Sequence, residues 1–515
     1  MKNSYLGIEL GSTRIKAVLI DGNFQIIASG SHSWENRLED GLWTYALDDV
    51  WHGIRAAYTE LAAEYKALFG HELTETGGIC ISAMMHGYLA FDENDNLLTP
   101  FRTWRNTNTG EAAEKLSELL GFNIPLRWSV AHYYQAVRDG EEHVKNVRYL
   151  TTLAGYVHRR LTGWRVLGVG DASGMFPTDG LGFNAEMLRK FENLTGVELR
   201  GLLPKILPAG DAAGALTVEG AALLDESGAL RAGIRFSPPE GDAGTGMVAT
   251  NSVAPRTGNI SAGTSVFAMA VLEVPLRGVY PEIDVVATPD GAPVAMVHCN
   301  SCTSDIDAWI RVFGEFAAAA GLVIDKSGLY SAFYDAALQG DADCGGLLSY
   351  NYFSGEPITG FDEGRPLFAR SPDASFTFPN FARTLLCSAI ATLRIGMDIL
   401  AERERVRLET LTGHGGFFKT ADAGQRLMAA ALCTPVSVFD AAGEGGAWGA
   451  ALLAAFASVR GQDESLGAFL DSRVFASTKA AICQPDTASV EGFNTFMKRY
   501  VAGLEIERTA VRELI

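Results

Sequence analysis

The feature that most constrains the fold is a hairpin pattern that occurs twice, about half a chain apart. Residues 10–20 and residues 262–272 each place a glycine and two hydroxyl residues between two apolar segments. This pattern is typical of a tight turn between two buried strands. Its repetition at half the chain length predicts two related domains that face each other.

The length and the apolar periodicity agree with a two-domain α/β protein. The chain has 515 residues, and a single core stops growing at roughly 250–300 residues. Short apolar segments that predict strands alternate with long amphipathic segments that predict helices, which is typical of an α/β architecture. The predicted strands are residues 5–9, 15–20, 25–29 and 79–83, and the clearest predicted helices are residues 49–67 and 493–504.

Turn residues set the predicted boundary between the two domains. Arg256 to Gly258 have turn character and stand just before the second hairpin. We therefore divide the chain into residues 1–256 and residues 257–515.

The charge balance excludes several classes of partner. The chain has 42 Lys and Arg residues against 61 Asp and Glu residues, which gives a formal charge of -19. Such a surface repels phosphate backbones and anionic membranes, so we expect no nucleic-acid and no membrane partner. It also repels free phosphate compounds, so any site for one must depend on backbone N–H groups, a metal and a few cations.

No targeting or spanning segment is expected. Glu9, Arg14 and Lys16 interrupt any apolar core of a secretory signal. The longest apolar stretch, residues 447–459, is shorter than the about 20 residues that cross a bilayer. We therefore predict a cytoplasmic protein, and the sequence leaves its oligomeric state open, with a homodimer as one option.

The two hairpin turns are candidate phosphate-binding sites. Gly11-Ser12-Thr13 and Gly263-Thr264-Ser265 each combine a glycine with two hydroxyl side chains. Glycine lets a phosphate approach the backbone, adjacent N–H groups bind anions, and hydroxyls add donors. Either turn alone is common, but two in matched hairpins could hold a triphosphate between two domains.

Two carboxylates are candidates for metal binding and base catalysis. Glu9 lies at a predicted strand end, where its carboxylate could hold Mg²⁺ through water, because this cation keeps several waters. Asp242 stands among glycines in Gly241-Asp242-Ala243-Gly244, where a ligand could reach it. A carboxylate beside a phosphoryl acceptor can take the hydroxyl proton. The alternatives are a plain strand-end carboxylate and an ordinary turn.

A further glycine-rich segment is a candidate nucleotide site. Gly413-His414-Gly415-Gly416 follows the apolar segment 408–412 and precedes a predicted helix. Exposed backbone there could seat an adenosine, and the alternative is a simple strand-to-helix turn.

The ordered set of motifs resembles the FGGY carbohydrate kinases, and most closely their xylulokinase branch. Glu9 to Lys16 resembles the first phosphate motif of the family, Gly263-Thr264-Ser265 its second, and Gly413-x-Gly415-Gly416 its adenosine motif. Gly241-Asp242 resembles the pair that carries the catalytic base, and Glu444 to Ala451 resembles a helix start of the family.

Segments expected to bind the sugar extend this resemblance. Met85-His86-Gly87 is similar to a Met-His-Gly segment that contacts the sugar, and Asp171-Ala172-Ser173-Gly174 resembles an Asp-Ala-Ser element of the same branch. Trp104-Arg105-Asn106 stands where that branch has Trp-Asn-Asp. The departures from the family are Glu9 for Asp, His414 in the glycine triplet, and Arg105-Asn106 for Asn-Asp.

The resemblance implies two actin-like, ribonuclease H-like domains with ATP and sugar in a catalytic cleft between them. It implies ATP and Mg²⁺ as cofactors, a ketopentose such as xylulose as acceptor, and another ketose, a polyol or a sugar acid as alternatives. Asp242 would be base, substrate contact and metal ligand together with Glu9. The nucleotide contacts would be Gly11, Ser12, Thr13, Lys16, Gly263, Thr264, Ser265, Gly413, Gly415 and Gly416, and the sugar contacts Met85, His86, Trp104, Arg105 and Asn106.

Two other classes of function are compatible with the same fold. A non-catalytic sugar or nucleotide sensor would keep the glycine turns and lose the base, so the presence of Asp242 favours an enzyme. An actin-like ATPase acting on proteins would not need the Met85-His86 and Trp104 segments, which favour a small polar ligand.

Overall fold

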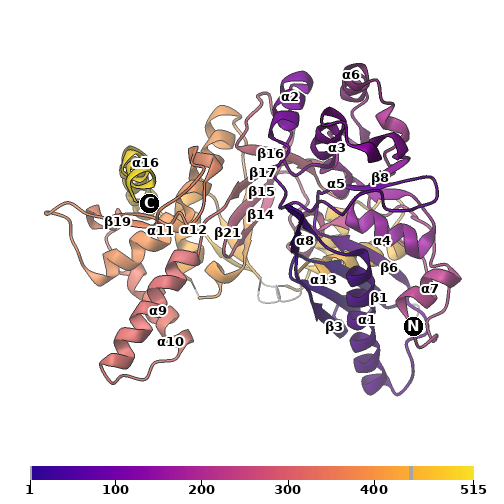
Figure 1. Cartoon of the computed structure of the whole chain (residues 1–515). Coiled ribbons are helices and arrows are strands. Elements are labelled where there is room, and N and C mark those ends of the chain that lie inside the picture. The colour runs from indigo at the N-terminus through magenta and orange to yellow at the C-terminus, as the bar shows by residue number, and fades with distance from the viewer. Residues whose placement is uncertain (1–2, 421, 440–444, 479, 515) are drawn as a thin grey trace. The chain divides into compact units, whose positions relative to one another are not determined.

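The chain forms two compact units that are built from separate stretches of sequence. The computed structural model describes residues 3–420, 422–439, 445–478 and 480–514 (Figure 1). One unit comprises Met1–Ala254, Asp284–Val294 and Ala441–Thr478, and the other comprises Pro255–Ile283, Ala295–Asp440 and Lys479–Ile515. Both units combine a central sheet with helices, which confirms the α/β class, whereas the division of the sequence at residue 256 stays a prediction.

The sheet of the first unit begins with the predicted hairpin. Its strand order is β13-β6-β1-β2-β3, in which the pairs β1–β2 and β2–β3 are antiparallel and the pairs β1–β6 and β6–β13 are parallel. The expected strands are present with small shifts at their ends. Their bounds are β1 (Tyr5–Leu10), β2 (Arg14–Ile20), β3 (Ile26–Ser33), β6 (Gly78–Ala83) and β13 (Glu240–Gly241).

One face of this sheet is covered by the helix predicted at residues 49–67. The helix α1 (Leu47–Phe69) packs along β2 and β3, and Figure 1 shows it beside β3. It is followed by Gly70, whose φ of 75° suits glycine. The apolar side chains expected on one face are all buried, namely Trp51, Ile54, Tyr58, Leu61 and Tyr65. The spacing of these residues therefore gave both the helix and the face that it buries.

Two helices cover the other face of this sheet, and one of them approaches the backbone of its neighbours closely. The helices α8 (Asp242–Ala249) and α13 (Gly445–Val459) pack against β1, β6 and each other. A Cβ atom at Gly7 would lie 2.0 Å from the carbonyl oxygen of Ala447, and one at Gly449 would lie 2.0 Å from that of Thr245. Only glycine permits these contacts, so they fix where α13 lies on the sheet.

The other elements of the first unit form smaller pairs of strands and flanking helices. The paired strands are β4 (Arg37–Glu39) with β5 (Leu42–Thr44), β7 (Leu89–Phe91) with β8 (Tyr149–Thr151), β9 (Val166–Gly168) with β12 (Lys205–Leu207), and β10 (Thr178–Asp179) with β11 (Gly182–Phe183). The helices are α2 (Gly110–Leu120), α3 (Ser129–Arg138), α4 (Leu153–Thr162), α5 (Val169–Ser173), α6 (Ala185–Thr195), α7 (Val218–Leu224) and α14 (Leu466–Phe469), and β16 (Ile283–Ala287) enters this unit at Asp284.

The sheet of the second unit repeats the arrangement around a hairpin. Six of its strands lie in the order β17-β15-β14-β20-β21-β22. As in the first unit, the first hairpin strand has an antiparallel partner on one side, β15, and a parallel partner on the other, β20. The bounds are β14 (Thr257–Ala262), β15 (Val266–Val271), β17 (Pro293–Cys299), β20 (Thr410–His414), β21 (Val436–Val438) and β22 (Ala481–Cys483). The internal repeat read from the sequence is thus a repeat of topology.

The second unit has a long apolar helix at its core. The helix α11 (Phe378–Asp398) continues to Arg403 and is long and apolar enough to cross a bilayer. However, 78% of its most apolar 18-residue stretch is buried inside the protein. Such burial is typical of a core helix. The other elements are α9 (Ser304–Ala319), α10 (Lys326–Leu338), α12 (Ala423–Leu432), α15 (Thr487–Ala502), α16 (Leu504–Glu513) and the strand pair β18 (Leu348–Tyr350) and β19 (Leu367–Ala369).

The C-terminal helix differs from the prediction at one point. Phe493, Phe496, Met497 and Tyr500 are buried on one face of α15, as expected. The single predicted helix is nevertheless two helices, because α15 ends at Ala502 and Leu504 begins α16. Gly503 separates them, and glycine weakens a helix interior.

We predict that Gly30→Ala destabilises the first unit by about 1–3 kcal/mol, the usual cost of overpacking. Gly30 lies in β3 under α1, where a Cβ atom would be 2.1 Å from the carbonyl oxygen of Ala57. The measurement is the midpoint of urea denaturation. Gly110→Ala is the matched control, because no atom lies within 4 Å of the added carbon, and equal midpoints for the two variants would contradict the packing argument.

Candidate active site

The predicted motifs of the first unit meet at one edge of its sheet. The parallel strands β1, β6 and β13 end in register, with Leu10 opposite Ala83 and Ala83 opposite Gly241. The segments that follow are the Gly11 turn, Met85-His86 and Asp242. Ligands of open α/β sheets bind outside the carboxyl ends of parallel strands, so this edge is the natural place for a site.

Two stacked aromatic residues brace the first phosphate turn. The Gly11 N–H donates to the Arg14 carbonyl at 3.0 Å. The Trp34 indole N–H donates to the Gly11 carbonyl at 2.7 Å, and the Tyr45 hydroxyl donates to the Ser12 carbonyl at 2.6 Å. The two rings stack with centroids 4.1 Å apart. The turn is therefore held from behind, and the side chains of Ser12 and Thr13 are exposed.

Glu9 lies in β1 with polar neighbours on both adjacent strands. In the sheet register it stands opposite Lys16 of β2 and Ser82 of β6. The hydroxyls of Ser82 and Thr245 are 2.8 Å apart, and Thr245 lies one turn after Asp242 in α8. This hydroxyl contact links β6, the strand beside Glu9, to α8, the helix that begins at Asp242.

Asp242 is the first residue of α8 and directly follows the last residue of β13. Its Oδ1 accepts hydrogen bonds from the backbone N–H of Met85 at 3.1 Å and of Ala243 at 3.0 Å. Asp242 is an exposed residue, although neighbouring protein atoms partly desolvate its carboxylate. Desolvation raises its pKa, and the two N–H donors oppose that rise. A carboxylate held with one oxygen fixed and a raised pKa suits proton transfer.

Two further carboxyl groups, Asp171 and Glu240, lie behind Asp242. Glu240 accepts from the N–H groups of Gly170 at 3.1 Å and Asp171 at 2.9 Å, and Asp171 accepts from the Thr152 hydroxyl at 2.6 Å. Burial, assisted by the charge of a nearby carboxylate and opposed by the hydrogen bonds, raises the pKa of Asp171 to about 7 and that of Glu240 to about 8. Sequence analysis gave Asp171 only as part of a motif and missed Glu240, because a carboxylate before a glycine has no signature of its own.

Met85 and His86 pack against glycines of the neighbouring segments. A Cβ atom at Gly241 would lie 2.2 Å from Met85 Cγ, and one at Gly174 would lie 2.7 Å from His86 Nδ1. His86 Nδ1 is 3.2 Å from the Gly174 carbonyl, and its ring stacks with Trp128 at 6.2 Å. His86 has a φ of 70°, an uncommon backbone for a residue with a side chain, which is typical of a functional segment.

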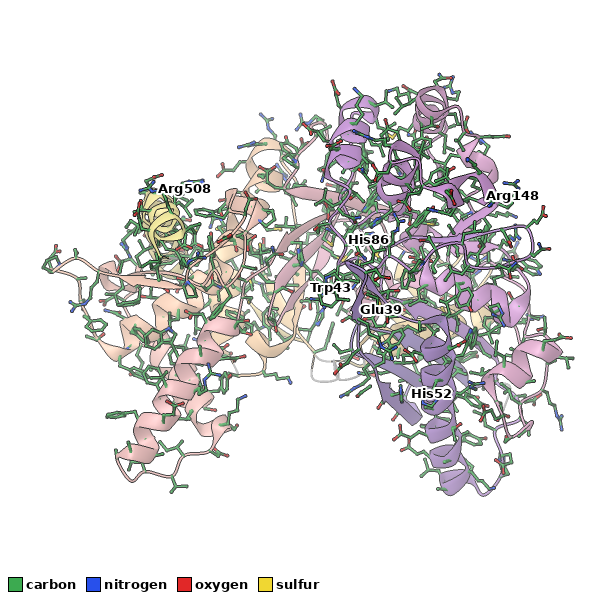
Figure 2. The ribbon with its side chains drawn as sticks, in the orientation of Figure 1. Glu39, Trp43, His52, His86, Arg148 and Arg508 are labelled. Carbon is green, nitrogen blue, oxygen red and sulfur yellow. The ribbon has the colours of Figure 1, made fainter. Side chains whose placement is uncertain are left out.

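The segment 104–106 is tied to Trp43, which Figure 2 labels together with His86. Asn106 is buried and clamps Trp43, since its Oδ1 accepts from the Trp43 N–H at 2.9 Å and its Nδ2 donates to the Trp43 carbonyl at 2.8 Å. The Arg105 guanidinium lies 3.6 Å above the Trp43 ring, and Trp104 is 39% exposed. Asn106 thus positions its neighbours, and Trp43 is a residue that sequence analysis did not place at the site.

The second unit brings its two glycine motifs together. In the second phosphate turn, the Gly263 N–H donates to the Ser265 carbonyl at 2.9 Å, and the Thr303 hydroxyl donates to the Gly263 carbonyl at 2.9 Å. Gly415 has a φ of 100°, and a Cβ atom there would lie 2.4 Å from the Ala262 carbonyl oxygen. The Gly413–Gly416 loop therefore lies directly against the start of the turn. Burial lowers the pKa of His414, which favours its neutral form.

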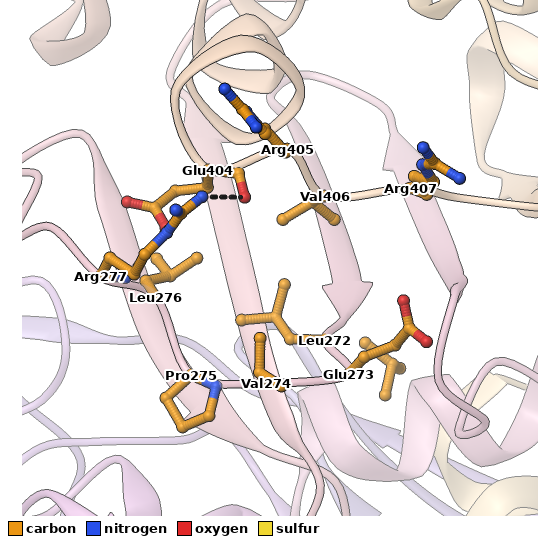
Figure 3. Close-up of a pocket in the computed structure, with 11 residues that line it drawn as sticks. Leu272, Glu273, Val274, Pro275, Leu276, Arg277, Glu404, Arg405, Val406 and Arg407 are labelled. Carbon is orange, nitrogen blue, oxygen red and sulfur yellow. Dashed lines mark hydrogen bonds and ion pairs between the residues drawn. The ribbon is translucent and has the colours of Figure 1, made fainter.

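One pocket and one predicted residue lie outside the site described above. A pocket of about 320 Å³ in the second unit lies between residues 271–277 and 404–407, where the Arg277 side chain donates to the Glu404 carbonyl (Figure 3). None of the predicted site residues lines this pocket. Glu444, at the start of the resemblance to a family helix, lies outside the described residues.

The comparisons with known proteins agree on one family. The model of the N-terminal domain of the FGGY family of carbohydrate kinases matches residues 4–242, and the model of its C-terminal domain matches residues 258–458. The chain therefore belongs to the FGGY family of carbohydrate kinases and is a sugar kinase, which confirms the predicted family, enzyme class and two-domain fold.

Individual relatives are distant in sequence, and some of them match over nearly the whole chain. A xylulose kinase from Haemophilus influenzae is 23% identical over 521 residues, spanning 97% of this chain and 99% of that protein. A gluconokinase from Bacillus subtilis is 24% identical over 216 residues, spanning 40% of this chain and 41% of that protein. The structure of a ligand-bound xylulose kinase from Lactobacillus acidophilus matches with a TM-score of 0.78 at 17% identity, covering 99% of both chains.

We predict that Asp171 and Glu240 make the protein less stable as the pH rises. Their folded-state pKa values of about 7 and 8 lie above the ordinary value near 4. Between pH 4 and 8 the unfolded chain therefore binds fewer protons, and the free energy of unfolding falls with pH. Asp171→Asn removes one titration, so urea denaturation from pH 5 to 8 should show a flatter slope than the wild type. Parallel curves would contradict the assignment.

Proposed function

We propose that the chain transfers the terminal phosphate of ATP to a hydroxyl of a small sugar, with a ketopentose such as xylulose as the acceptor. Carbohydrate kinases of the FGGY family use ATP and bind a small sugar. The curated relatives that span most of the chain are xylulose kinases. The alternative acceptors are another ketose, a polyol or a sugar acid, and the gluconokinase relative favours including sugar acids in any test.

One observation carries the proposal, which is the position of Asp242. Its carboxylate stands at the carboxyl edge of the sheet, with Oδ1 held by the Met85 N–H, next to His86. Asp242 would take the proton from the acceptor hydroxyl while that oxygen forms its bond to the terminal phosphorus. The bond between this phosphorus and the bridging oxygen would break, with ADP as the leaving group. Phosphoryl transfer needs positioning and electrostatic stabilisation more than covalent chemistry.

The sugar would be read by groups around Met85 and His86. Sugar sites combine a few convergent polar groups with an apolar or aromatic floor. Met85, His86, Trp104 and Arg105 supply both kinds of contact, whereas Asn106 would act through Trp43 and Arg105. Both amide hydrogens of Asn106 already donate, to the carbonyls of Trp43 and Thr103.

The nucleotide would be held by the glycine turns of the two units. Gly11, Ser12, Thr13 and Lys16 would contact phosphates from the first unit. Gly263, Thr264 and Ser265 would contact phosphates from the second, and Gly413, Gly415 and Gly416 the adenosine. Backbone N–H groups and hydroxyls suit a protein whose overall charge repels ATP.

The donor set fits Mg²⁺ bound mainly through water. Within the described residues, no three His, Cys, Asp or Glu side chains group closely enough to hold a metal ion. Glu9 and Asp242 are oxygen donors, and Mg²⁺ usually keeps several waters and takes one or two carboxylates. When bound, Mg²⁺ would neutralise charge that develops on the phosphates. Glu9 and Asp242 would orient its waters.

The cellular location, the partners and the oligomeric state of the enzyme are also proposals. We propose a cytoplasmic protein without nucleic-acid or membrane partners, and a homodimer is one option for its assembly. The formal charge of -19 supports the absence of nucleic-acid and membrane partners.

The test of the proposed function is ADP release with ATP, Mg²⁺ and a panel of ketopentoses, other ketoses, polyols and aldonic acids. We expect a ketopentose to raise ADP formation well above the rate without sugar. Asp242→Asn should lower turnover by about 10²–10⁴-fold, the range for a general base, while ATP binding is retained. A panel without any stimulated rate would overturn the proposed sugar phosphorylation, and wild-type turnover in Asp242→Asn would remove this residue from the chemistry.

We predict that Glu9→Gln raises the Mg²⁺ concentration needed for half-maximal rate without loss of the fold. The neutral amide retains the shape of the side chain and loses the charge that orients the metal-bound waters. Glu9→Asp is the matched control and should keep most of the activity, because it retains the charge. Wild-type dependence on Mg²⁺ in Glu9→Gln would show that Glu9 has no role toward the metal.

A further inference from the structure

Gly446, in the first turn of α13, lies directly against the Glu9 side chain. A Cβ atom at Gly446 would lie 2.2 Å from Glu9 Oε1 and 2.8 Å from Glu9 Cδ. Real Cβ atoms do not approach other atoms within 3.0 Å. Any side chain at residue 446 would therefore compete with the Glu9 carboxylate for the same space.

We infer that Gly446 is a positioning residue that makes room for the longer carboxylate at residue 9. The inference rests on the role of Glu9 in the proposed function. Glutamate places its carboxylate about 1.5 Å, one C–C bond, farther from the backbone than aspartate does. Gly446 accommodates this extra length, so residues 9 and 446 form a matched pair.

The neighbours of this carboxylate are polar residues of β2, β6 and α8. The same added carbon would lie 3.0 Å from Thr245 Oγ1, and that hydroxyl is 2.8 Å from Ser82 Oγ. Ser82 and Lys16 stand opposite Glu9 on the two neighbouring strands. A methyl group at residue 446 would therefore displace the carboxylate from its present position.

Movement of α13 away from Glu9 would cost the close packing of this helix on the sheet. Farther along α13, the Ala447 carbonyl and the Ala451 N–H approach Gly7, where a Cβ atom would be 2.0 Å and 2.5 Å from the oxygen and nitrogen. Gly449 approaches the Thr245 carbonyl as closely. These contacts fix α13 on β1 and α8, so the strain from a methyl group would fall on the side chain of Glu9.

The experiment is a double-mutant cycle on the full chain, read by thermal unfolding without ligands. Alanine is the better helix former by up to about 1 kcal/mol, so Gly446→Ala should raise the melting temperature wherever space permits. We expect it to lower the melting temperature in the wild-type background. In the Glu9→Asp background we expect no change or an increase, because the shorter carboxylate leaves room.

Gly449→Ala is the matched control for the cycle. It meets the backbone of Thr245, whatever the residue at position 9, so it should lower the melting temperature equally in both backgrounds. The inference is overturned if Gly446→Ala also shifts the melting temperature equally in the two backgrounds.

Kinase assays of the wild type, Gly446→Ala, Glu9→Asp and the double variant give a second readout. Gly446→Ala should raise the Mg²⁺ concentration for half-maximal rate at least about 3-fold, and adding Glu9→Asp should restore it. A general loss of helix stability would not be rescued by a change at residue 9. If no sugar stimulates ADP release, the proposed function fails, whereas the thermal cycle still tests the matched pair separately.

Discussion

The close approach of α13 to the sheet of the first unit is the constraint on which the site depends. Gly7 and Gly449 let helix backbone touch the backbone of β1 and α8, at distances that any side chain would prevent. Protein interiors are packed as densely as organic crystals, so such contacts leave little space for α13 to shift on the sheet. Because Glu9 is the last residue but one of β1 and Asp242 begins α8, the same packing sets the surroundings of both carboxylates.

The site is supported by residues that do not themselves face a ligand. Trp34 and Tyr45 hold the carbonyls of the first phosphate turn, Asn106 clamps Trp43, and Glu240 binds the N–H groups of Gly170 and Asp171. A catalytic group is effective when its supports restrict its orientation. Burial of Asp171 and Glu240 behind Asp242 raises the pKa of both groups, chiefly by desolvation and also by the charge of a neighbouring carboxylate, and this lowers stability near neutral pH.

The two units use one topology for different tasks. In each, a hairpin strand pairs with a parallel strand on its far side, so a glycine turn and a second segment emerge at the same sheet edge. The first unit places Met85-His86 and Asp242 beside its turn, and the second places the Gly413–Gly416 loop there. The difference lies in the residues after the strands, since loops can vary while the sheet is kept.

The sequence by itself determined the α/β class, the repeated hairpin, the burial of one face of α1 and the family, because periodicity and ordered motifs are local properties of the chain. Tertiary structure alone decided the role of Asn106 as a clamp, the carboxyl pair behind Asp242, and the contact between Gly446 and Glu9. In each of these the partners are far apart in sequence, and no spacing rule connects them. Folding brings these partners together because the parallel strands end at one edge of the sheet. Gly7 and Gly449 let α13 pack closely beside that edge.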